Sequence, residues 1–242
     1  MSELVRSIRE RYLTVLDQIS SAANKSGRSP EAVKLVVVTK SQPLDVVQAT
    51  IEAGAVVLGE NYAEEGVTKI QSLQNASAVE WHMIGHIQSR KAQLVAANFN
   101  WIHSIDSLKL AKRLDRFCAE AGRVLPVLLE FNVGGEESKG GWQASDESRW
   151  TELLAEVAEI LALPNLQVRG LMSMPPLGET AEFSRGYFQN TKRLRDFFAG
   201  QFPQADFSEL SMGTSSDYEV AVEEGATFVR VGTAIVGSRH YS

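Results

Sequence analysis

Short apolar runs alternate with amphipathic segments along the whole chain. The runs are rich in Val, Ile and Leu, which is typical of buried strands. The amphipathic segments repeat apolar residues three or four positions apart, which is typical of helices that cover a core. A first helix is predicted at residues 1–25, and it ends at the sequence KSGRSP. Strands are then predicted at 34–39, 55–58, 79–84, 101–105, 125–133, 168–174 and 207–213 and within 227–237, with helices at 43–53, 62–73, 89–97, 108–121, 146–161, 181–198 and 218–225.

This strict alternation of strand and helix predicts parallel strands joined by crossover helices. Eight such units in 242 residues fit an α/β fold of the (β/α)8 TIM-barrel type, with one extra helix at the N-terminus. No linker or change of composition divides the chain, so we expect residues 1–242 to form one domain. A doubly wound open sheet is the alternative. The sequence has no GxGxxG after the first strand, which argues against the dinucleotide-binding form of that fold.

Composition narrows the classes of function. The chain has 44% hydrophobic and 22% charged residues and a net charge of −6, so it is an ordinary globular protein and not a basic nucleic-acid binder. It contains no apolar stretch long enough to span a membrane, and its N-terminus lacks the features of a signal peptide. A single cysteine, Cys118, fits a reducing compartment, and we expect a cytoplasmic protein.

The active site of a (β/α)8 barrel lies at the carboxyl ends of its strands. In this chain the predicted strand ends carry an amine, a guanidinium, several amide or hydroxyl groups, and glycine-rich turns. These segments are Lys40, 59–61, 82–86, 104–106, 130–132, 172–174, 211–213 and 230–233.

Two glycine turns follow the last two strands. LSMGTSSDYEVAV places Gly213 after the seventh strand, and its Ser/Ser/Asp cluster could cap the next helix; VRVGTAIVG places Gly232 and Thr233 after the eighth. Each could be an ordinary turn glycine. Phosphate sites in these barrels commonly form from these two loops, so the adjacent pair favours a phosphate site.

Two cationic residues indicate which kind of ligand this site binds. Arg230 interrupts an apolar strand, so it must pair with an acid or face a ligand, since an isolated buried charge is costly. Lys40 ends the run LVVVTK. Such a lysine could simply be a solvated residue at the end of a strand, but an apolar barrel mouth would lower its pKa and favour the neutral, nucleophilic amine. A lysine, a phosphate cradle and an arginine that suits a pyridine nitrogen are what pyridoxal 5′-phosphate requires. A Schiff-base aldolase acting on a phosphosugar would explain the lysine and the phosphate site but not Arg230.

Seven motifs together resemble one family. VVVTKSQP, LGENYAEE, WHMIGHIQSRK, NVGGEESKGG, GLMSMPP, LSMGTSSDYEVAVEEG and VRVGTAIVG, in this order, closely resemble the pyridoxal phosphate homeostasis proteins (the YggS/PROSC family), which are similar to the barrel domain of alanine racemase. The resemblance implies a fold type III barrel for pyridoxal 5′-phosphate. This sequence departs from the family pattern at two positions. Thr214 stands where a Met is usual, and Arg90 stands where an Asn is usual.

The resemblance and the strand ends together predict the cofactor contacts. The resemblance implies that Lys40 is the Schiff-base lysine and that Arg230 faces the pyridine nitrogen. It also implies that Asn61 lines the site and that Ser211 and the Gly232-Thr233 turn hold the phosphate. No catalytic or metal-binding residue is expected. His82 and His86 are four positions apart, but no carboxylate completes a metal set. The residues predicted to bind pyridoxal 5′-phosphate are Lys40, Asn61, His82, Ile84, Met172, Ser211, Gly213, Arg230, Gly232 and Thr233.

Two kinds of function fit such a site. One is an enzyme, for instance an amino-acid racemase. The other is a protein that stores or delivers the cofactor without robust turnover, with pyridoxal phosphate-dependent apo-enzymes as recipients. We expect the second, as a monomer or weak dimer that contacts neither nucleic acid nor membrane. Related racemases carry an additional β-domain that supplies an opposing acid or base, and the sequence runs only a few residues beyond the eighth strand. A permanently cationic Arg230 would also make the cofactor a poorer electron sink, but this alone would not prevent catalysis, since racemases with the same arrangement work.

Overall fold

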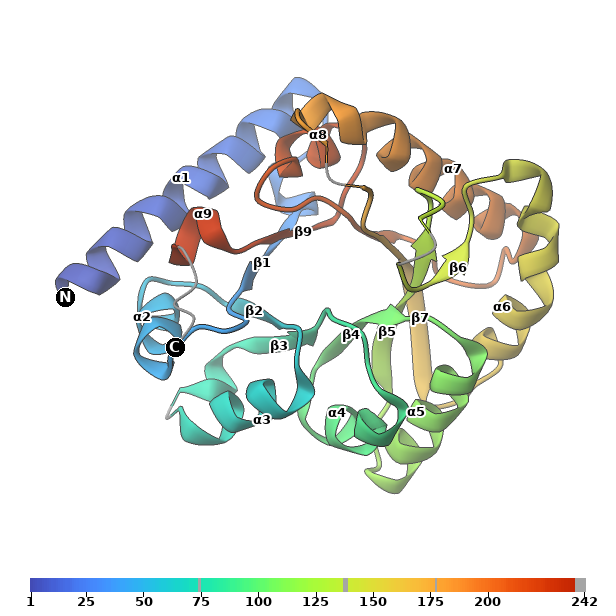
Figure 1. The fold of residues 1–242 in the computed structure, drawn as a ribbon, viewed down its shortest axis with the longest axis horizontal. Helices are drawn as coiled ribbons and strands as arrows, with labels where there is room; N and C mark the ends of the chain where they lie inside the picture. Colours follow the sequence, from blue (N-terminus) through green and yellow to red (C-terminus); the bar gives the residue numbers. More distant parts are fainter. Residues whose placement is uncertain (74, 137–138, 177, 238–242) are drawn as a thin grey trace.

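A closed barrel of parallel strands forms the centre of the molecule (Figure 1). The computed structural model describes residues 1–73, 75–136, 139–176 and 178–237. The strands within these ranges are β1 (Lys34–Val38), β2 (Val57–Glu60), β3 (Glu80–Met83), β4 (Trp101–Ile105), β5 (Leu125–Asn132), β6 (Trp142–Gln143), β7 (Leu166–Ser173), β8 (Glu209–Ser211) and β9 (Phe228–Val231).

The pairing of the strands confirms the (β/α)8 prediction. Along the sheet the order is β4-β3-β2-β1-β9-β8-β7-β5, all parallel, and β4 also pairs with β5. Because of that last pairing these eight strands have no free edge, so the alternative of an open doubly wound sheet is wrong. The two-residue strand β6 adds to the end of β5, outside the closed ring.

Helices surround the strands (Figure 1). The α-helices in the described ranges are α1 (Glu3–Lys25), α2 (Leu44–Glu52), α3 (Ala63–Ser72), α4 (Ala92–Asn98), α5 (Leu108–Glu120), α6 (Leu154–Leu161), α7 (Arg185–Gln201), α8 (Tyr218–Glu223) and α9 (Thr233–Val236). Short 3-10 helices are η1 (Pro30–Ala32), η2 (Ala76–Ala78), η3 (Ser89–Lys91), η4 (Glu147–Leu153) and η5 (Ala181–Ser184). The predicted helix at 146–161 is therefore η4 followed by α6, and the final apolar run divides into β9 and α9 at Gly232.

Two apolar layers explain the sequence of β1. Leu35 and Val37 belong to the large core between the strands and the helices, whereas Val36 belongs to a small core inside the barrel. The inner core also contains Phe228 and Met172. Both faces of each parallel strand are covered, so the strand is a continuous run of β-branched residues and not an alternating one.

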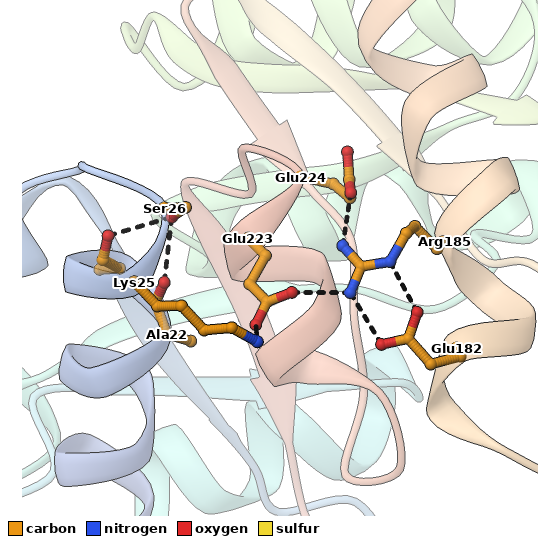
Figure 2. A network of polar contacts seen from close by, with 8 residues as sticks. Ala22, Lys25, Ser26, Glu182, Arg185, Glu223 and Glu224 are labelled. Carbon is orange, nitrogen blue, oxygen red and sulfur yellow. Dashed lines mark hydrogen bonds and ion pairs between the residues drawn. The ribbon is translucent and has the colours of Figure 1, made fainter.

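The extra N-terminal helix α1 is attached to the last helices of the chain. Arg11 Nε donates to the carbonyl of Ile235 in α9 at 2.5 Å. Figure 2 shows a second attachment, in which Lys25 at the end of α1 pairs with Glu223 of α8 at 2.5 Å. Glu223 also pairs with Arg185 of α7 at 2.7 Å. Networks of this kind hold their members better than isolated surface pairs do.

Within the described ranges, no helix combines the length and the apolar character that a membrane span requires.

Cys118 is buried on α5, and burial raises the pKa of its thiol to about 11. A thiol in this state is packed and unreactive at neutral pH.

Candidate functional site

A cavity of about 900 Å³ opens at the carboxyl ends of the strands. Its size lies within the range of small-molecule sites. Seven of the ten predicted cofactor residues line it: Lys40, Asn61, Ile84, Met172, Arg230, Gly232 and Thr233. They come from β1, β2, β3, β7 and β9 or from the loops that follow these strands, which is the convergence that a barrel imposes.

Lys40 and Arg230 enter the cavity from neighbouring strands. In the ladder between β1 and β9, Arg230 is the partner of Val36, whose side chain belongs to the inner core. Partners in register share a face of the sheet, so the guanidinium also points into the barrel. Lys40 follows β1 two residues after its end and is partly exposed at the mouth. One cavity therefore contains an amine near solvent and a guanidinium deeper in the barrel.

Arg230 is 5% exposed and is held by neutral groups. Its Nη1 donates to Ser211 Oγ at 2.6 Å, and its Nη2 donates to the carbonyl of Ser173 at 2.9 Å. No carboxylate in the described part of the chain lies within ion-pair distance of it, so the salt bridge considered from sequence is absent there. Burial lowers the pKa of Arg230 to about 10, which still leaves it cationic at neutral pH.

The two loops predicted to hold a phosphate meet at one wall. Thr214, Ser215 and Ser216 line the cavity beside Gly232 and Thr233. The two loops are joined by a hydrogen bond from the Gly232 amide to Ser215 Oγ, at 3.1 Å. Gly232 lies so close to β1 that a Cβ would come within 3.2 Å of the Val38 carbonyl oxygen. This wall consists of hydroxyl and amide groups, which is the donor chemistry that a phosphate requires.

The Ser/Ser/Asp cluster does not cap helix α8 as predicted. Asp217 occupies the N-cap position, but its side chain makes no capping hydrogen bond to that helix. Its Oδ1 accepts from the Thr214 amide at 2.7 Å, and its Oδ2 accepts from Ser184 Oγ at 2.7 Å. The aspartate thus fixes the loop that forms the wall.

Three predicted residues, His82, Ser211 and Gly213, are not among those that line the cavity. Gly213 has a φ of 91° and packs against α8, where a Cβ would come within 2.5 Å of Ala221 Cβ. The other two lie beneath the cavity, fully buried in the barrel interior. Ser211 accepts a hydrogen bond from Arg230, and His82 is connected to Ser211 through His103.

A chain of hydrogen bonds runs from Arg230 through the inside of the barrel. Ser211 Oγ lies 2.8 Å from His103 Nδ1, and His103 Nε2 lies 3.0 Å from His82 Nδ1. His82 Nε2 then lies 3.3 Å from Glu80 at the opposite end of β3. Burial lowers the pKa of both histidines, so both are neutral. Because Arg230 can only donate, neutral imidazoles let every group donate to the next, down to the Glu80 carboxylate.

An acidic corner of the cavity was missed as a binding element. Glu130, Asp106 and His86 line it, and His86 Nδ1 lies 2.8 Å from Asp106 Oδ2. Burial, and then repulsion from Asp106, raise the pKa of Glu130 to about 7. The signal was present, since all three residues lie in predicted strand-end segments. No group of His, Cys, Asp and Glu in the described residues has the geometry of a metal site.

Comparison with known proteins places the chain in a family. Residues 16–240 match the alanine racemase N-terminal domain. A pyridoxal phosphate homeostasis protein of Escherichia coli K12 is 41% identical, with 98% of this chain and 99% of that protein covered. A protein of the same name from Aquifex aeolicus is 39% identical, with 96% and 98% covered.

Solved structures agree with these relatives. PipY of Synechococcus elongatus PCC7942 has been solved without PLP (TM-score 0.84, 36% identity) and with PLP bound (TM-score 0.80, 35% identity). In both cases 95% of this chain and 100% of PipY are covered. Alanine racemase of Clostridium difficile 630 shares the fold alone, with a TM-score of 0.70 and 16% identity over 98% of this chain and 60% of its own. The chain thus belongs to the alanine racemase N-terminal domain family and to the pyridoxal phosphate homeostasis proteins.

Proposed function

We propose that this protein binds pyridoxal 5′-phosphate through Lys40 and maintains the cellular supply of this cofactor. One observation carries the proposal: Lys40, Arg230 and the hydroxyl-rich wall of residues 214–216 line a single cavity of suitable size. The names of the relatives and the PLP-bound structure of PipY support the same ligand.

The groups that line the cavity fit each part of this cofactor. When bound, pyridoxal 5′-phosphate supplies an aldehyde that forms Schiff bases with primary amines, conjugated to a ring that withdraws electrons. Lys40 contributes the amine at the mouth. Arg230 would contribute a donor that suits an unprotonated pyridine nitrogen, and Ser215, Ser216 and Thr233, which line the same cavity, would contribute hydroxyl donors for the phosphate.

Arg230 fits a carrier but does not by itself prevent catalysis. Its guanidinium stays charged at neutral pH and is fixed by Ser211 and Ser173, so it would oppose a proton on a ring nitrogen bound beside it. An unprotonated ring is a poorer electron sink, which slows bond cleavage at a bound amino acid. We therefore propose storage and delivery to apo-enzymes in the cytoplasm, without robust turnover. The relatives are named for homeostasis and not for a reaction.

The covalent attachment can be tested directly. Purified protein is loaded with pyridoxal 5′-phosphate, reduced with borohydride and digested, and mass spectrometry locates the modified lysine. We expect the modification on Lys40 and its loss in Lys40→Ala. Lys139→Ala is the matched control, because Lys139 also lines the cavity and should leave the modification in place. Specific modification of another lysine would overturn the assignment.

A second measurement separates carrier from enzyme. The loaded protein is incubated with L-alanine and other amino acids, and chiral chromatography follows the products. Carrier function predicts no catalytic turnover together with transfer of the cofactor to an added apo-enzyme. Many turnovers per protein molecule, at rates ordinary for racemases, would contradict it.

A further inference from the structure

Three buried or partly buried charges lie directly behind Lys40, outside the cavity. Lys69 of α3 has a side chain that is only 4% exposed, and its Nζ contacts Glu60 at 2.8 Å and Glu65 at 2.5 Å. Glu60, at the end of β2, is fully buried. None of these three residues lines the cavity, so the cofactor contacts do not account for them.

These charges hold the backbone on both sides of Lys40. Before it, the carbonyl of Thr39 accepts from Lys69 Nζ at 2.7 Å, and Thr39 Oγ1 donates to Glu60 Oε1 at 2.6 Å. After it, the amide of Ser41 donates to Glu65 Oε1 at 2.6 Å. Both neighbours of the lysine in the chain are thus fixed by the same group of side chains.

The turn that they hold is strained. Ser41 has a φ of 57°, and it is the one residue other than glycine with a positive φ in the described parts of the chain. A serine in this conformation costs about 1 kcal/mol or more relative to an extended or helical one. The bond from Ser41 to Glu65 offsets this cost, and the chain turns sharply after Lys40 instead of continuing along the strand.

Stability alone does not account for burying these charges. Burial raises the pKa of Glu60, and its second oxygen, Oε2, has no hydrogen-bond partner among the described residues. Replacing such a group by apolar side chains is often neutral or stabilising, because burial removes the charges from water. A role in fixing one local geometry is a better explanation for its presence.

We propose that Glu60, Glu65 and Lys69 are positioning residues that hold Lys40 in the orientation that attacks the aldehyde. The proposal rests on the function proposed above, since it concerns the amine of that same site. Without the three side chains, the turn at Ser41 relaxes and the Lys40 amine is no longer held towards the cavity. Binding of the ring and phosphate should persist, because Arg230 and the wall of residues 214–216 belong to or follow β8 and β9 and not β1.

The test compares two ligands that differ only in the group that Lys40 attacks. Pyridoxine 5′-phosphate has an alcohol in place of the aldehyde but keeps the ring and phosphate. We expect Lys69→Met to weaken pyridoxal 5′-phosphate binding about tenfold or more and to slow its covalent attachment, with pyridoxine 5′-phosphate binding unchanged. Lys112→Met is the matched control, because it removes a lysine from an ion pair with Glu159 whose side chains are about half exposed.

A second variant guards against misfolding. The Glu65 side chain is 29% exposed, so Glu65→Ala removes the contact to Ser41 without emptying the core, and it should show the same selective loss. The positioning role would be overturned if the variants bound each ligand as tightly as the wild-type protein does. It would also be overturned if they lost the same factor of affinity for both ligands. Failure of the wild-type protein to bind pyridoxal 5′-phosphate at all would instead refute the proposed function.

Discussion

The neutral histidine at the centre of the barrel makes the stability of the protein depend on pH. His103 is fully buried, and its two ring nitrogens contact Ser211 and His82. Burial, followed by repulsion from His82 and Arg230, holds the pKa of His103 well below its usual value. The unfolded chain therefore takes up a proton at a pH where the folded protein does not, so the stability contributed by neutral His103 is present above about pH 6.5 and is lost as pH falls below it.

The size of this effect follows from the pKa of the unfolded chain. With an unfolded pKa of about 6.5 and no protonation in the folded state, unfolding is favoured by about 1.4 kcal/mol more at about pH 5.5 than at about pH 7.5. We expect His103→Gln to abolish that dependence. Glutamine can accept from Ser211 and donate to His82 as the imidazole does, but it does not titrate.

Urea unfolding of both proteins across this pH range measures the effect. The quantity to follow is the difference between the two unfolding free energies, because Glu130 contributes a trend of the opposite sign in both proteins. That difference should change by about 1.4 kcal/mol between about pH 7.5 and about pH 5.5, and it should stay constant above about pH 7.5. A difference that is constant throughout would mean that His103 has the same pKa in the folded and unfolded states, which would refute the lowered pKa assigned to it.

Two further substitutions test the site and the barrel. The raised pKa of Glu130 means that the folded protein keeps a proton that the unfolded chain has lost, so stability falls as pH rises from about 4.5 to about 7. Glu130→Gln should remove about 2 kcal/mol of that fall between about pH 5.5 and about pH 7.5, and parallel stability curves for the two proteins would contradict the assignment. Gly170→Ala should destabilise the protein by about 3 kcal/mol or more, since its Cβ would lie 1.8 Å from the Glu209 carbonyl oxygen. Gly186→Ala on α7 is the control, with open space around its Cβ, and thermal melts in which both variants behave alike would refute the clash.

The barrel was predictable because its signal is repeated eight times along the chain. The ends of elements were less so: β8 spans only Glu209–Ser211, whereas the apolar pattern covers 207–213. The two-residue strand β6 pairs only with the end of β5 and has no periodicity to reveal it. That residues 1–242 are one domain, and that the protein is a monomer or weak dimer, remain predictions.

The site was predictable at the level of strands but not of depth. His82 and Ser211 were grouped with the cavity because they lie near strand ends, yet both sit one layer below it. Depth in a barrel depends on the register between strands, which a single sequence does not contain. Lys69 was overlooked for a related reason. A lysine four residues after Glu65 on a helix is usually a surface ion pair, and only the packing of α3 against the end of β1 buries it.

The ladder between β1 and β9 has a consequence for synthesis of the protein. It joins Lys34 to Phe228 and Val36 to Arg230, so Arg230 lies on the last strand to leave the ribosome, whereas Lys40 directly follows the first. A nascent chain that lacks β9 has neither a closed ring nor the wall at Gly232, and it holds Lys40 without its counterpart. We therefore expect the complete cavity to form only once β9 has been synthesised and has paired with β1.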